Sequence, residues 1–309
     1  MTQQSPMRPG QPRRQTLRGQ VSQIIVIDKD GQNRSCIYET GDLIEAPNWT
    51  HDGKWLIYNG DGRLYKISPD GKDGPHRINT YPVENLNNDH VLSPDGKNIY
   101  ISANDGHLYE VSIEGGTPRK ISNDHGPVGK FRYYLHGVSP DNTTLIYIGI
   151  ERDANNKQIS AIYAIPTQGG PDVKLTDGNH YVDGCEYTPD GKWIYYNSEQ
   201  VAKREGHAQI FRMRPDGSEQ EQLTFDDRVN WFPHFPRDGH MIMYISFPSD
   251  TIGHPADKDV TINTMDLDGK NIKTIDQFNG GQGTVNVNSW SPDNVRFAYV
   301  AYTYPDGKK

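Results

Sequence analysis

A short phrase recurs six times along the chain, and its spacing constrains the fold more than any other feature. Each copy places Pro-Asp-Gly, or a close variant, before a run of aromatic and β-branched residues, as in VLSPDGKNIYI and EYTPDGKWIYY. With Thr50, Ser93, Ser139, Thr188, Pro236 and Ser291 taken as equivalent, the successive steps are 43, 46, 49, 48 and 55 residues. Self-similarity at such a period indicates a repeat architecture.

Each repeat has the pattern of two β-hairpins. Pro-Asp-Gly is a tight-turn signal, because proline presets φ, aspartate bonds its own backbone and glycine accepts positive φ. A second Gly-rich turn follows in most units, as in YKISPDGKDG and YEVSIEGGTP. A unit of about 45 residues with four short strands is typical of one propeller blade. The sequence therefore predicts an all-β fold, a six-bladed β-propeller of four-stranded antiparallel blades.

The two ends of the chain predict how the ring closes. Residues 297–302 (FAYVAY) finish only the inner hairpin of a last blade, while residues 23–27 and 34–38 form an unmatched outer hairpin. Pairing these strands leaves few exposed sheet edges. We therefore expect a flexible N-terminal arm over residues 1–19, one propeller domain over 20–303 and a tail over 304–309.

Charge and hydropathy exclude two classes of partner. The net charge is −8 with scattered basic residues, whereas a nucleic-acid surface needs clustered Lys and Arg. No apolar run is long enough to span a membrane. The first 19 residues lack the apolar core of a secretory signal. This predicts a cytoplasmic chain if Met1 is the native start, with a periplasmic location as the alternative.

The repeated phrases, VLSPDGKNIYI and EYTPDGKWIYY above all, resemble the repeats of the TolB-like propeller family over residues 20–303. The same blade occurs in protein-docking propellers, in the propellers of prolyl oligopeptidase-type peptidases and in oligogalacturonate lyases, so the resemblance implies a fold before it implies a function. No G-x-S-x-G nucleophile motif accompanies it here.

Polar residues stand just before each Pro-Asp-Gly turn, where the innermost strand of a blade runs beside the propeller axis. Buried polar groups there cost free energy unless they bind water, a metal or a ligand. The axial set consists of Asn48, Asp89, His90, His136, Cys185, Glu186, His234 and Asn288. We expect these side chains to line a pocket on one face of the propeller.

Loops that lead to the same face suggest what such a pocket binds. They are rich in Asn, Asp, His and aromatic residues, which suits a saccharide, because its faces are apolar and its edges form hydrogen bonds. The residues predicted to bind a saccharide or uronate are Asn48, Asp89, Tyr134, Arg152, Arg204, His207, Trp231, Gln282 and Asn288.

A divalent metal, Mn, Zn or Fe, is a further hypothesis, because imidazoles and a carboxylate make a suitable ligand set. The predicted ligands are His90, His136, His234 and Glu186. The resemblance to oligogalacturonate lyases, whose axial metal is held by histidines and a glutamine, implies Gln282 as that glutamine. Asn286 and Asn288 stand where that family has histidines.

Two classes of function are compatible with these residues. In a carbohydrate lyase or hydrolase, His136 or His90 is the general base, Glu186 is the acid or a metal ligand, and Arg152 or Arg204 holds a carboxylate. In the alternative, the chain is a non-catalytic propeller that docks another protein, as a Tol-like scaffold or a transport-associated protein. The alternative requires no metal.

Overall fold

The repeated phrase forms a turn closed by its own side chains in the computed structural model, which describes residues 14–126, 130–153 and 155–304. Ser93 Oγ donates to Asp95 Oδ1 at 2.6 Å, and the amide of Lys97 donates to the same oxygen at 3.1 Å. The amide of Gly96, whose φ is +71°, donates to the Ser93 carbonyl. The same Ser or Thr to Asp bond recurs at Thr50, Ser139, Thr188 and Ser291.

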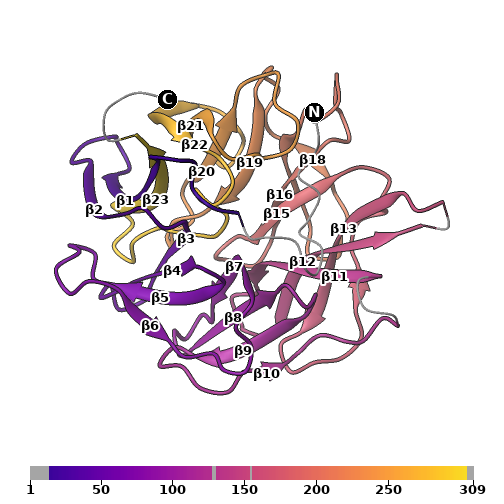
Figure 1. Ribbon diagram of the computed structural model, residues 1–309. Coiled ribbons are helices and arrows are strands. Elements are labelled where there is room, and N and C mark those ends of the chain that lie inside the picture. The colour runs from indigo at the N-terminus through magenta and orange to yellow at the C-terminus, as the bar shows by residue number, and fades with distance from the viewer. Residues whose placement is uncertain (1–13, 127–129, 154, 305–309) are drawn as a thin grey trace.

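These turns connect the strands of six antiparallel sheets arranged around one axis, so the predicted six-bladed propeller is confirmed (Figure 1). Blade 1 contains β3 (Ile44–Trp49), β4 (Leu56–Gly60), β5 (Arg63–Ile67) and β6 (His76–Ile78). Blade 2 contains β7 (Leu86–Leu92), β8 (Asn98–Ala103), β9 (Leu108–Ser112) and β10 (Arg119–Lys120). Blade 3 contains β11 (Phe131–Val138), β12 (Thr144–Arg152), β13 (Gln158–Pro166) and β14 (Val173–Lys174).

The remaining blades follow the same order. Blade 4 contains β15 (Val182–Tyr187), β16 (Ile194–Ser198), β17 (Gln209–Met213) and β18 (Glu221–Gln222). Blade 5 contains β19 (Val229–His234), β20 (Ile242–Phe247), β21 (Lys258–Met265) and β22 (Lys273–Gly280). Blade 6 joins the two ends of the chain through β1 (Val21–Asp28), β2 (Ser35–Thr40) and β23 (Arg296–Thr303).

Ring closure occurs as predicted, by antiparallel pairing of β1 with β23 from Val21↔Thr303 to Asp28↔Arg296. The innermost segment of blade 6 departs from a regular strand. It pairs with β23 only through an isolated bridge between Trp290 and Phe297 and a few backbone hydrogen bonds, such as Val300 N to the Thr284 carbonyl at 3.1 Å. Blade 6 is therefore a three-stranded sheet with an irregular inner edge.

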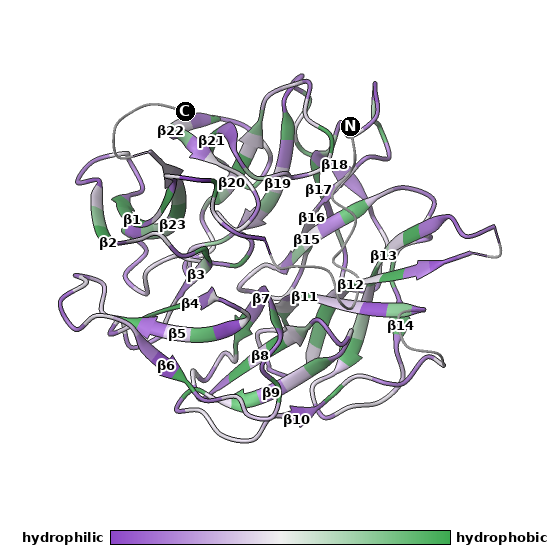
Figure 2. Cartoon of the chain, in the orientation of Figure 1, coloured by the Kyte–Doolittle hydropathy of each residue, from purple (hydrophilic) through white to green (hydrophobic). Residues whose placement is uncertain are grey.

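The hydrophobic core is divided into six clusters, one at each contact between neighbouring blades. Strand alternation explains the division. Leu56 and Tyr58 of β4 pack with Val300 of blade 6, whereas Ile57 between them packs with Ile99 of blade 2. Figure 2 shows the hydrophobic residues along the strands and the polar ones in the connections.

Antiparallel order gives the disc two distinct faces. The connections between the second and third strands, and those that enter each innermost strand, emerge on one side, which we call the loop face. The Pro-Asp-Gly turns emerge on the other side, the turn face. Within the described part of the chain, no helix is long and apolar enough to cross a membrane.

Part of the predicted flexible arm lies against the loop face. Thr16 Oγ1 donates to the Gly41 carbonyl at 2.7 Å, and the Gln20 side chain donates to Asp257. Figure 1 shows this first described stretch starting near the middle of the ring before it joins β1. Residues 1–13 and most of the predicted tail lie outside the described residues, and the domain limits at 20 and 303 stay predictions.

Candidate functional site

The innermost strands share one irregularity that sets which side chains line the axis. In β3, β15 and β19 the pairing shifts at a bulge, so that Asp183 pairs with Asn197 and Glu186 with Tyr195. Three residues of β15 thus match two of β16, which places Asp183 and Glu186 on the same side of the sheet. The bulge contains a left-handed residue, with φ of +55° at Ala46, +58° at Gly184 and +55° at Phe232.

Nearer the turn face, the axial side chains bond to one another. Glu186 Oε2 lies 2.5 Å from His234 Nδ1, and Glu186 Oε1 accepts from Asn288 Nδ2 at 2.6 Å. His234 Nε2 lies 2.8 Å from the Val285 carbonyl. Both ring nitrogens and both carboxylate oxygens therefore have partners, and the network links blades 4, 5 and 6.

His90 and Asn48 lie in the same layer but belong to a separate contact between blades 1 and 2. His90 is fully buried, and its Nδ1 lies 2.8 Å from Asn59 Oδ1. Burial lowers the pKa of His90 to about 4, so the ring is neutral at pH 7. Asn48 Nδ2 donates to the His90 carbonyl at 3.5 Å.

A second polar group, which we call the axial cluster, lies nearer the loop face and consists of Asp89, Tyr134, His136, Asp183 and His254. Asp183 is central, since its Oδ1 lies 2.9 Å from His136 Nε2 and its Oδ2 lies 3.6 Å from His254 Nε2. Although burial opposes its ionisation, the hydrogen bond to His136 and the nearby His254 hold the pKa of Asp183 well below its ordinary value. Burial lowers the pKa of His136, but the bond to Asp183 and the charge of Asp89 raise it overall.

Among the described residues, no cationic group lies at hydrogen-bond distance from Asp89, another carboxylate of the axial cluster. It is buried, and its Oδ2 accepts from Asn87 Nδ2 at 2.8 Å. Burial raises the pKa of Asp89 to about 6. The charge of His136 opposes this rise, and the charge of Asp183 adds to it. Burial also raises the pKa of Tyr134 to about 12.

A third carboxylate, the partly buried Glu45 at the start of β3, faces the N-terminal segment. Its Oε1 lies 3.1 Å from Nη1 of Arg14, which also donates to the Gln282 carbonyl at 2.6 Å. The Arg14 guanidinium carbon lies 4.4 Å from the centre of the Tyr302 ring. Burial raises the pKa of Glu45, while Arg14 opposes the rise.

Other residues predicted to bind ligand hold the scaffold together. Arg204 donates to the carbonyls of Ser249 and Asp227, and Arg152 donates to the Asn156 carbonyl of its own hairpin. His207 Nε2 lies 3.0 Å from the Asp226 carbonyl. Trp231 is fully buried in a core cluster. Their roles in ligand binding stay predictions that the geometry does not favour.

The predicted metal ligands do not come together as a set. His234 and Glu186 bond to each other, His136 bonds to Asp183, and His90 bonds to Asn59. Among the described residues, no group of three or more His, Cys, Asp or Glu is arranged to hold a metal. The donor set therefore does not fit a divalent cation, and no cofactor is established.

The residues predicted from the sequence to form the site do not include Glu45, Asp183 or His254. A signal was present, because each acid stands three residues before an axial residue, Glu45 before Asn48 and Asp183 before Glu186. Because of the bulge, residues three positions apart lie on the same face of the sheet. Nothing in the spacing indicates Arg14, whose segment carries no strand pattern.

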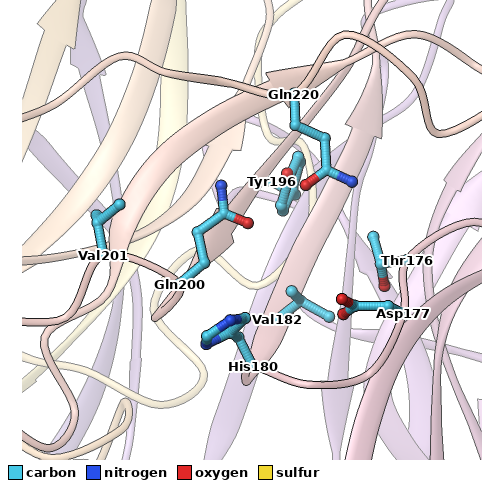
Figure 3. A pocket seen from close by; sticks show the side chains of 8 residues that line it. All are labelled: Thr176, Asp177, His180, Val182, Tyr196, Gln200, Val201 and Gln220. Carbon is cyan, nitrogen blue, oxygen red and sulfur yellow. The ribbon is translucent and has the colours of Figure 1, made fainter.

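A separate pocket of about 320 Å³ lies away from the axis, between blades 3 and 4 (Figure 3). Its lining residues are Thr176, Asp177, His180, Val182, Tyr196, Gln200, Val201 and Gln220. None of these is a predicted site residue. We therefore place the candidate site at the loop-face end of the axis, where the buried charges gather.

Fold and site together define a six-bladed propeller with a buried acidic cluster at one end of its axis. An uncharacterized protein of Agrobacterium fabrum is 40% identical over 270 residues, which cover 86% of this chain and 87% of that protein. A solved candidate TolB from Agrobacterium tumefaciens matches with a TM-score of 0.82 and 36% identity, over 92% of this chain and 98% of that one. The chain belongs to the TolB-like β-propeller family. No family model matches it.

Two more distant matches also cover most of this chain. The Tol-Pal system protein TolB of Francisella tularensis is 24% identical over 298 residues, which are 89% of this chain and 61% of that protein. The chain thus spans about three-fifths of that relative. An oligogalacturonate lyase in complex with manganese shares 13% identity and a TM-score of 0.56, over 94% of this chain and 99% of that one, which shows the fold alone.

Replacing Asp89 with asparagine is expected to stabilise the protein by about 2–3 kcal/mol at pH 8 and to change little at pH 4. The pKa of Asp89 is about 6 in the folded state and 3.8 ordinarily, so its ionisation costs stability as the pH rises between these values. The asparagine removes that cost and keeps an acceptor for Asn87. Urea unfolding at both pH values measures the difference, and a loss of stability at pH 8 would contradict the argument.

Proposed function

We propose that the chain is a non-catalytic docking propeller, whose loop face binds a protein segment that carries a cationic side chain to the end of the axis. The observation that supports this most directly is the position of residues 14–20. This stretch of polypeptide lies on the loop face and places an arginine against a partly buried carboxylate.

Charge at the site is complementary to such a segment. Glu45, Asp89 and Asp183 are three carboxylates within one region, of which Asp89 and Asp183 are buried and Glu45 is partly buried. Their mutual repulsion contributes to the raised pKa of Asp89. Among the described residues, His136, His254 and Arg14 lie beside these carboxylates, and the pKa of Asp89 is still raised in their presence. An incoming cation would therefore be attracted electrostatically.

Exposed apolar side chains are concentrated on the same face. Tyr81 and Phe225 are 67% and 68% exposed, and both lie in connections that enter an innermost strand. Val201 and Ile252 are also exposed, in connections between second and third strands. Aromatic residues around a polar centre are characteristic of protein interfaces.

The relatives agree with a docking role. The name of the Francisella tularensis relative assigns that protein to the Tol-Pal system, which is consistent with assembly among several proteins. By analogy, this chain would act as a scaffold within such an assembly. Membership in the family also favours the predicted periplasmic location over the cytoplasmic one.

The predicted saccharide or uronate pocket has less support. Trp231, an aromatic residue predicted to bind a saccharide, is buried in the core. Three carboxylates would repel a uronate, and the metal that would offset them does not fit. A neutral saccharide stays a prediction, and calorimetric titration with neutral oligosaccharides tests it.

Photo-crosslinking from chosen positions tests the docking proposal. A photoreactive amino acid at Tyr81 or Phe225 is expected to yield one major protein adduct in cells, because these positions lie on the proposed interface. The same amino acid at Ile272 or Val295, exposed residues of the turn face, is the matched control. Adducts from the turn face alone, or from neither face, would contradict the proposal.

A further inference from the structure

We propose that Glu45, Tyr302 and the Gln282 carbonyl form a guanidinium-binding site, which Arg14 fills within the chain and which an arginine of the docked partner fills in its place. The site itself is argued from the structure alone. The identity of the second occupant rests on the proposed docking function.

Arg14 has the contacts that distinguish a built site from a chance surface pair. Its Nη1 reaches Glu45 Oε1 at 3.1 Å and the Gln282 carbonyl at 2.6 Å, and the Tyr302 hydroxyl lies 3.4 Å away. The planar cation also lies over the Tyr302 ring at 4.4 Å. A site made of a carboxylate, a carbonyl and the face of an aromatic ring binds arginine better than lysine, because the lysine ammonium has no planar face.

The fold holds the three groups in place before any guanidinium arrives. The Tyr302 hydroxyl donates to the Gln282 carbonyl at 3.1 Å, and the Ala46 amide donates to the Gly283 carbonyl at 2.7 Å. Gly283 has a φ of +87°, and a Cβ there would lie 2.4 Å from the Tyr302 hydroxyl and 2.6 Å from Glu45 Cγ. A glycine at 283 is therefore what lets this loop approach both side chains.

Over its described residues, 14–20, the segment that carries Arg14 has few other attachments. Thr16 and Gln20 each make one side-chain bond to the propeller, and Leu17 is half exposed. Few buried contacts mean that such a segment opens at low cost. Opening would take the guanidinium away from Glu45 and from the Gln282 carbonyl, and both would lose a charge-assisted hydrogen bond. Replacement by another arginine is therefore preferred over an empty site.

Chemical rescue tests the site without any partner. Arg14→Ala removes the guanidinium, and millimolar ethylguanidinium is expected to raise the thermal midpoint of this variant by about 2 °C more than that of the native chain. Ethylammonium should give a smaller rise. The double variant Arg14→Ala/Glu45→Gln is the control, in which the rescue should vanish. An equal response of all three proteins would overturn the site.

A peptide tests exchange at the site. The labelled peptide GQPRRQTLRGQ, which is residues 10–20 of this chain, is expected to bind the full-length Arg14→Ala variant at least tenfold more tightly than the native chain. The same peptide with citrulline in place of Arg14 keeps the shape but loses the charge, and it should bind at least tenfold more weakly. Equal binding of both peptides, or equal binding to both proteins, would overturn the exchange.

A third test keeps Arg14 in place and measures how often its segment opens. In the otherwise native chain, Glu45→Gln is expected to speed trypsin cleavage after Arg14 several-fold, because the segment opens more often. Unchanged cleavage would count against the site. Failure of these three tests would leave the docking proposal standing, since it depends on the positions of the crosslinks.

Discussion

Replacing Asp183 with asparagine is expected to lower the free energy of unfolding by about 3–5 kcal/mol at pH 6, the largest effect of any single change in the axial cluster. The substitution removes the carboxylate that lies between His136 and His254. A buried imidazole whose pKa is raised by that carboxylate is left without its partner. Urea unfolding measures the loss, and Asp89→Asn, which replaces a carboxylate of the same cluster, should act in the opposite direction.

The pH dependence of this loss is set by the signs of the two shifts. The pKa of Asp183 is lowered in the folded state, so its contribution is present above its ordinary value of 3.8 and is lost as the pH falls. The pKa of His136 is raised, so its contribution is present below 6.5 and is lost as the pH rises through the folded value. The difference between native and Asp183→Asn proteins should therefore be largest near pH 4–6.5. A difference that is constant from pH 3 to pH 9 would contradict the ion pair.

Replacing Gly217 with alanine is expected to cost about 3 kcal/mol, although the residue lies far from the axial cluster. Gly217 lies in the outer turn of blade 4 with a φ of +86°, and an added Cβ would lie 2.3 Å from the Leu175 carbonyl of blade 3. Gly71 and Gly269 approach the preceding blade in the same way, at 1.9 and 2.2 Å. The cost combines a left-handed non-glycine residue with overpacking between two backbones.

Gly74→Ala is the matched control for the glycine prediction. Gly74 has a similar φ of +66°, but nothing lies within 4 Å of the position of its Cβ. Only the backbone cost applies there, about 1 kcal/mol. Urea unfolding of the two variants separates the backbone cost from the cost of the close contact with the neighbouring blade. Equal losses would mean that the close approach of neighbouring blades does not limit residue 217.

The blade architecture could be predicted because each turn is determined locally. A Ser or Thr, an Asp and a Gly within four residues close the turn by bonds among themselves, as at Ser93 and Asp95. The alternation of Leu56, Ile57 and Tyr58 along the strand likewise indicates which of the two neighbouring blades each side chain packs against. The irregular inner edge of blade 6 is not local, since it depends on how the chain ends meet across the ring.

The candidate site was only partly predictable. The polar axial positions are evident from the repeat, but their partners depend on contacts between blades, so Glu186 and His234 were expected to share a metal and instead bond to each other. The bulge brings Glu45 and Asp183 into the site, and its left-handed residue is an alanine in β3 rather than a glycine. Arg14 arrives from a segment without periodicity, which no pattern of the repeat could place.

Docking of a protein on the loop face is tested by a titration with the protein that crosslinks to Phe225. Its affinity for the native chain is compared with that for Tyr81→Ala/Phe225→Ala and for the turn-face control Ile272→Ala/Val295→Ala. All four side chains are exposed, so both pairs should leave the fold intact. We predict a loss of at least tenfold for the loop-face pair and no change for the control. Equal affinities for all three proteins would contradict the claim.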